Sequence, residues 1–132
     1  MTANASQGDN FRFMVIYDTQ TNSGAAPTIT DILATADVTS PMNLNNRDRF
    51  HVIWDSKKSQ WAYTQTTNVL TNGSVKNDYM HKYKKCKKEV VFSGTGGTIG
   101  SIQTGSILFL TCSQLTTSFS IDGYFRFRFY DS

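Results

Sequence analysis

The chain has 132 residues, of which 13% are aromatic and 17% charged, and its formal net charge is +3. This length fits one domain with room for a hydrophobic core. No apolar run approaches the roughly 20 residues that a membrane-spanning helix needs, so we expect a soluble chain without a membrane partner. Cys86 and Cys112 are too few for a disulfide-rich scaffold or a four-ligand zinc site, and we expect both thiols to be reduced.

The first half of the chain predicts one buried strand and one short helix. Residues 1–10 are small and polar, and we expect a flexible terminus. Residues 11–18 carry apolar side chains on both faces of a strand, which is typical of a central strand. Residues 28–35 are spaced for a helix of at most two turns, capped by Thr28 or Thr30.

Residues 45–55 predict a polar turn followed by a strand. Strict alternation places Phe50, Val52 and Trp54 on one face, fit for a core. The other face holds Arg49, His51 and Asp55, which suit a wet surface or, with Arg47, a contact with a neighbouring subunit. Local salt bridges among the charged residues of this stretch are the alternative interpretation. The polar residues 57–59 predict a hairpin turn into a strand over 60–66.

The second half predicts three further strands. One lies within residues 78–92 and ends at Phe92, one is the buried run 106–113, and the last is 124–130. Between the first two, the Gly-rich residues 93–105 predict a flexible connection. About six strands, joined by long and uneven loops, predict an all-β antiparallel sandwich or single jelly roll with one short helix.

Residues 82–88 form the only cluster of charge, with five of the thirteen basic residues of the chain. One interpretation is a solvated edge strand whose lysines discourage aggregation. The other is a strip that neutralises phosphates, in which interleaved aromatic rings stack on unpaired bases. Arg126 and Arg128 alternate with phenylalanines on the last strand. They either lie over the sheet and pair with acids such as Asp18 or Asp131, or extend a cationic surface. For this second interpretation the candidate nucleic-acid-binding residues are Lys82, Tyr83, Lys84, Lys85, Lys87, Lys88, Arg126 and Arg128.

No motif for catalysis or for a cofactor occurs in the sequence. The spacing of the two histidines does not pair either of them with a nucleophilic side chain. The acidic residues are scattered singly, so they form no carboxylate pair. We therefore expect a protein that is not an enzyme and holds no metal or cofactor. A carbohydrate-binding jelly-roll module is an alternative function, and it would require an exposed aromatic platform, with Trp54, Trp61 and Tyr63 as candidates.

Three segments resemble one family. They are residues 11–33 (FRFMVIYDTQTNSGAAPTITDIL), residues 40–50 (SPMNLNNRDRF) leading into VIWD at 52–55, and the closing residues 123–131 (GYFRFRFYD). They resemble capsid proteins of small eukaryotic viruses with circular, Rep-encoding single-stranded DNA genomes (CRESS-DNA viruses), the circovirus-like group. The first two segments, in this order, are fairly specific, and the third is weak by itself.

The resemblance implies a single jelly-roll domain over residues 1–132 that self-assembles into a small icosahedral shell, of the T=1 kind, around single-stranded DNA. It implies a place in the virion, and in the host nucleus or cytoplasm during assembly. Proteins of this group begin with a basic arm, whereas residues 1–10 contain neither Arg nor Lys. Their first two strands would precede Phe11, so we expect this chain to be a partial capsid protein or one with an alternative start.

Overall fold

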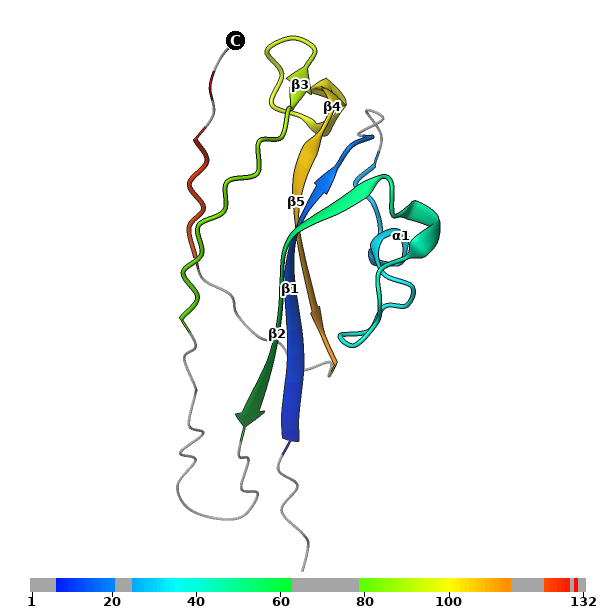
Figure 1. Ribbon diagram of the computed structural model, residues 1–132, viewed down its shortest axis with the longest axis vertical. Coiled ribbons are helices and arrows are strands. Elements are labelled where there is room, and N and C mark those ends of the chain that lie inside the picture. The colour runs from blue at the N-terminus through cyan, green and yellow to red at the C-terminus, as the bar shows by residue number, and fades with distance from the viewer. Residues whose placement is uncertain (1–6, 21–24, 63–78, 115–122, 129, 131–132) are drawn as a thin grey trace, which may run out of the picture.

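The computed structural model describes residues 7–20, 25–62, 79–114, 123–128 and 130. Its described strands are β1 (Gln7–Asp18), β2 (Phe50–Ala62), β3 (Val91–Phe92), β4 (Ile102–Thr104) and β5 (Ser106–Ser113), and its helix is α1 (Ile29–Ile32). The strands form an antiparallel sheet in the order β2-β1-β5 and an antiparallel pair β3-β4 (Figure 1). The predicted all-β, jelly-roll-like fold is confirmed. No helix in the described part is long and apolar enough to cross a membrane.

β1 is the central strand, as its two apolar faces predict. It pairs with β2 along its whole length and with β5 from Phe11 to Asp18. We call the side with Met14 and Ile16 the helix face, because α1 and its loops cover it, and the side with Phe13 and Tyr17 the aromatic face. Since successive side chains of a strand point to opposite sides, both surfaces of this strand can be buried.

The helix face holds the hydrophobic core. Met14 and Ile16 of β1 are fully buried against Ile32 and Leu33, and Phe50 of β2 completes the cluster. The helix is short, as expected, and Thr28 is its N-cap. The Thr28 backbone N–H and hydroxyl both donate to Asp31 Oδ2 at 2.7 Å, which lowers the pKa of the Asp31 carboxyl. This capping box fixes the start of the helix where the chain crosses the sheet.

A β-bulge in β2 corrects the predicted alternation of residues 50–55. Val52 pairs with Ile16 and Trp54 with Val15, so Ile53 is the extra residue. A bulge shifts everything beyond it to the opposite face. Trp54 therefore joins the aromatic face, where its ring meets Phe13 edge-on at 5.1 Å between centroids. Asp55 moves to the helix face, so the prediction that it shares a face with His51 is wrong.

Three further predictions need correction. Residues 57–59 form no turn, because β2 continues to Ala62 in pairing with β1, and lysine and serine do not force a chain reversal. Residues 93–105 contain the helical turn Ile99–Ser101 and the strand β4 rather than only a connection. The described part of 124–130 has no strand assignment, and within 78–92 only β3 does.

Candidate nucleic-acid interface

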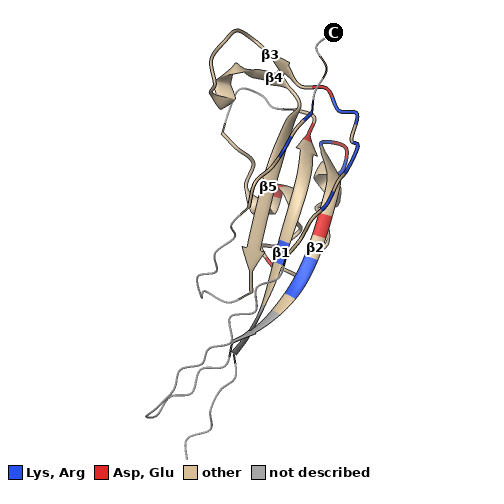
Figure 2. Ribbon diagram, turned by 90° about the vertical axis from the view of Figure 1, so that its left-hand side faces the viewer, with Lys and Arg blue, Asp and Glu red and all other residues tan. Residues whose placement is uncertain are grey.

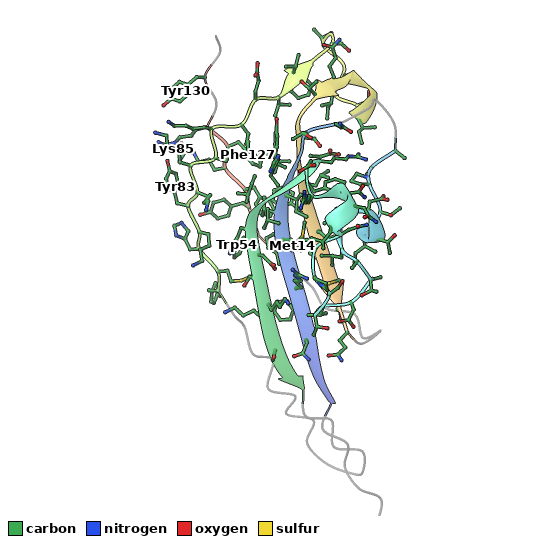
Figure 3. All side chains as sticks on the ribbon, turned by 45° about the vertical axis from the view of Figure 1, so that its right-hand side comes forward. Met14, Trp54, Tyr83, Lys85, Phe127 and Tyr130 are labelled. Atoms are coloured by element: carbon green, nitrogen blue, oxygen red, sulfur yellow. The ribbon has the colours of Figure 1, made fainter. Side chains whose placement is uncertain are left out.

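Two extended segments lie on the opposite side of the central sheet from α1 (Figure 1). We call residues 79–90 the basic segment and residues 123–130 the C-terminal segment, whose residue 129 is not described. They run beside each other in Figures 1 and 3, although about forty residues separate them in sequence. The predicted cationic strip and the predicted arginines thus belong to one surface.

The basic segment is attached to the sheet at both ends. Near its start, the Ser56 hydroxyl of β2 lies 3.7 Å from Met80 Sδ. Near its end, the Tyr17 hydroxyl of β1 donates to the Glu89 carbonyl oxygen at 2.5 Å. The ammonium group of Lys88 lies 4.9 Å from the centre of the Tyr17 ring, within range of a cation–π interaction. Tyr17 is thus the main anchor of this segment.

The surroundings of Tyr17 explain the local backbone. Burial raises the pKa of the Tyr17 phenol, and the negative charges of Glu89 and Asp18 add to the increase. Gly105 adopts φ +74°, and a Cβ there would collide with the Glu89 carbonyl oxygen and lie 2.6 Å from the Tyr17 hydroxyl. Only glycine fits this close approach without strain. Lys87, next to the anchor, has a left-handed φ of 46°, which is uncommon for lysine.

The C-terminal segment is attached through its phenylalanines. The Phe125 ring lies 4.0 Å from that of Phe109 and is stacked parallel to Phe13 at 6.4 Å. Phe127 also approaches Phe109, at 6.3 Å. Arg126 and Arg128 alternate with these rings and are exposed. The predicted alternation of Phe against Arg is therefore present, although no strand is assigned in this segment.

The combined surface is strongly cationic. Figure 2 shows the basic residues following one another along the extended segment that leads into β3. In the described part of the two segments, Glu89 is the only acidic residue. The exposed cations are Lys82, Lys84, Lys85, Lys87, Lys88, Arg126 and Arg128. Such a surface attracts a polyanion and contacts phosphates without reading sequence.

The residues predicted to contact a neighbouring subunit do not form one cluster. Arg49 makes a two-pronged ion pair with the buried Asp18, with both bonds at 2.9 Å, and Asp55 does the same with Arg12 at 2.8 and 2.6 Å. Arg47 pairs with Asp48 at 3.7 Å, and both side chains are largely exposed. His51 lies on the aromatic face with its ring 6.4 Å from that of Tyr17. Contact between subunits remains a prediction.

Neither a metal cluster nor a disulfide occurs in the part of the chain that the structure describes. No three His, Cys, Asp or Glu side chains there converge on a possible metal ion, and Cys86 and Cys112 are not bonded to each other. Burial raises the pKa of the Cys112 thiol, which disfavours the reactive thiolate.

An exposed aromatic platform for carbohydrate would need Trp54 in the open. The Trp54 side chain is half-buried and packs against Phe13 instead. The other two candidates, the side chain of Trp61 and residue Tyr63, lie outside the described residues. The geometry of Trp54 gives no support to the carbohydrate interpretation.

Sequence reasoning missed Tyr124 and Tyr130 as members of the cationic surface. Both are exposed, and in Figure 3 Tyr130 lies near Lys85 and Tyr83 and points away from the sheet as they do. The alternation of residues 124–130 placed both tyrosines on the arginine side, which was a usable signal. What the sequence lacked was the contact between two segments distant along the chain.

An antiparallel all-β fold of the jelly-roll kind with a cationic outer layer is compatible with a viral coat protein. The family model of the Satellite tobacco necrosis virus coat protein matches residues 1–131. The chain belongs to this family. No curated protein matches the chain. A viral coat protein is structural, and its place is the virion.

Proposed function

We propose that this coat protein assembles into a small icosahedral shell, of the T=1 kind, around single-stranded DNA. The observation that carries the nucleic-acid part is the pairing of the basic segment with the C-terminal segment into one cationic surface. The resemblance of residues 11–33, 40–50, 52–55 and 123–131 to circovirus-like capsid proteins supports DNA as the enclosed polymer and the host nucleus or cytoplasm as the place of assembly.

The lysines of the basic segment bind phosphates as point charges in this proposal, together with Arg126 and Arg128. Each phosphate neutralised on a single strand contributes about 0.7 to the slope of log affinity against log salt concentration. Replacing all five lysines of residues 82–88 by glutamine should therefore reduce that slope by up to about 3.5. Fluorescence anisotropy of a labelled oligothymidylate over a range of salt concentrations measures the slope.

A control with matched charge tests whether position matters. Lys84→Gln removes one charge from the basic segment, and Lys57→Gln removes one from the helix face of β2, where residue 57 is opposite Arg12. We expect the variant of the basic segment to reduce the salt slope, and the variant of β2 to leave the slope close to that of the parent protein. Equal slopes for the two variants would show that only net charge matters, and would contradict this surface as the binding site.

For contacts between copies we propose the exposed turn that precedes β2, together with His51. Leu44 keeps three quarters of its surface exposed, and Arg47 beside it is also exposed. An apolar side chain flanked by an unburied cation suits a contact that is buried only on assembly. Arg49 and Asp55 are already paired internally, with Asp18 and Arg12, so they would support the fold of the subunit rather than bind the neighbour. Arg47→Glu should reduce shell formation while the subunit stays folded.

A further inference from the structure

Four tyrosines on the cationic surface are almost completely exposed. The exposed fractions are 93% for Tyr79, 82% for Tyr83, 89% for Tyr124 and 98% for Tyr130. Phe125 and Phe127 are interleaved with the last two, yet they pack on Phe109 and are only about half exposed, at 54% and 55%. The tyrosine rings therefore have both π-faces available, whereas the phenylalanines attach the segment to the sheet.

The spacing along the basic segment suits bases. Alternate residues of an extended chain lie on one side, about 6.5–7 Å apart. A base inserted between two rings separates them by about 7 Å, which is twice the 3.4 Å rise between stacked bases. Tyr79, His81 and Tyr83 are alternate residues and are all exposed, while Met80 between them is half-buried toward the sheet. At the spacing of an extended chain, three rings in this order would leave two gaps of about the size of a base.

The charge around the rings selects the occupant. The seven cations of the surface oppose one acidic residue, Glu89, in the described part of both segments. A second copy of this face would bring like charges together, so self-association through it is disfavoured. A polyanion that carries aromatic rings with free faces can bind the cations through its charge and the tyrosines through its rings. Bases in a duplex are stacked on each other and hide their faces, whereas unpaired bases can stack on protein rings.

We propose that this surface selects unpaired over paired DNA, because bases stack on Tyr79, Tyr83, Tyr124 and Tyr130 while the lysines and arginines hold the phosphates. This deepens the proposed function and rests on it. The lysines supply affinity for any nucleic acid, and the tyrosines supply preference for a single strand. Removal of a stacking ring typically weakens single-strand binding by about fivefold or more.

The experiment uses Tyr79→Leu/Tyr83→Leu, which removes two rings without a change of charge. Affinities for a labelled oligothymidylate, for a duplex of equal length and for an abasic strand of equal length are measured at one salt concentration. We expect the variant, which lacks two rings, to lose at least about twenty-fivefold in affinity for oligothymidylate. Its affinities for the duplex and the abasic strand, and its salt slope, should stay as in the parent protein.

Two results overturn the inference. One is an unchanged oligothymidylate affinity in the variant, and the other is an equal loss on all three probes, which would indicate a damaged surface rather than lost stacking. Because the four rings are exposed, circular dichroism and the denaturation midpoint should not change, and a second pair, Tyr124→Leu/Tyr130→Leu, repeats the test on the other segment. If the proposed cationic binding surface is itself wrong, the salt slope will be unchanged in the lysine variants, and this result is independent of the tyrosine experiment.

Discussion

At the scale of single residues, four of the five arginines of this chain divide into two roles. Arg12 and Arg49 are held in ion pairs on the helix face, and the Arg12 guanidinium also donates to the carbonyl oxygens of Ser40 and Val38. Arg126 and Arg128 are exposed on the cationic surface. Residue type alone does not separate these two roles. The partner does, because Arg12 and Arg49 each face an aspartate of the fold.

Asp55→Ala tests the internal pair. The Arg12 side chain is only 4% exposed. Removal of its carboxylate partner therefore leaves a buried positive charge that is hydrogen-bonded to two carbonyl groups but has lost its negative partner. Breaking such a pair costs about 3 kcal/mol of unfolding free energy, at the lower end of the usual range because Asp55 is 32% exposed. Asp48→Ala, which breaks the exposed pair with Arg47, is the control and should leave stability unchanged in urea denaturation. Similar losses in the two variants would contradict this account.

Tyr17 makes stability depend on alkaline pH. Its pKa is raised above the ordinary 10.0, so the folded state prefers the neutral phenol, and its contribution is complete below pH 10. That contribution is lost as the pH rises through the folded-state pKa. The stability difference between the parent protein and Tyr17→Phe should therefore shrink above pH 10, as measured by urea denaturation at several pH values. A difference that stays constant up to pH 11 would contradict a neutral, anchoring phenol.

At the scale of elements, the sequence predicted each described long strand and the helix but not every boundary or face. Residues 106–113 were predicted with the bounds of β5, and residues 11–18 were correctly predicted as a strand, because continuous or alternating apolar runs are strong local signals. β1 nevertheless begins earlier, at Gln7, inside the segment 1–10 that was expected to be a flexible terminus. The face of Trp54 was wrong because one bulged residue at Ile53 reverses the alternation, and no local feature of residues 50–55 marks a bulge. The polar stretch 57–59 was misread because pairing with β1, a contact distant in sequence, keeps it extended.

The attachment of the basic segment is tested at Gly105. Gly105→Ala combines a left-handed φ with a collision against Glu89 and Tyr17, so it should detach the segment, lower stability and weaken DNA binding. Gly94→Ala has a φ of +87° but open space around it, and Gly97→Ala has neither constraint. Denaturation and anisotropy measurements should rank the losses as Gly105, then Gly94, then Gly97. If Gly94→Ala were as damaging to DNA binding as Gly105→Ala, strain rather than attachment would be responsible.

At the scale of the whole molecule, the sheet has a core on one face and a binding layer on the other. α1 and its loops close the helix face, and the two extended segments lie across the aromatic face (Figure 1). Composition and strand pattern predicted the sandwich, and the charge cluster predicted half of the binding surface. The other half required knowledge that residues 79–90 and 123–130 run side by side, which no local pattern encodes.

Assembly is the central claim, and electron microscopy of the purified protein combined with light scattering after size-exclusion chromatography tests it most directly. We expect closed, uniform shells of many copies that form more readily with single-stranded DNA than without it. Nuclease treatment before and after the shells are opened should show that the enclosed DNA is protected. A protein that stays monomeric at every salt concentration and pH, with DNA present, would contradict the account.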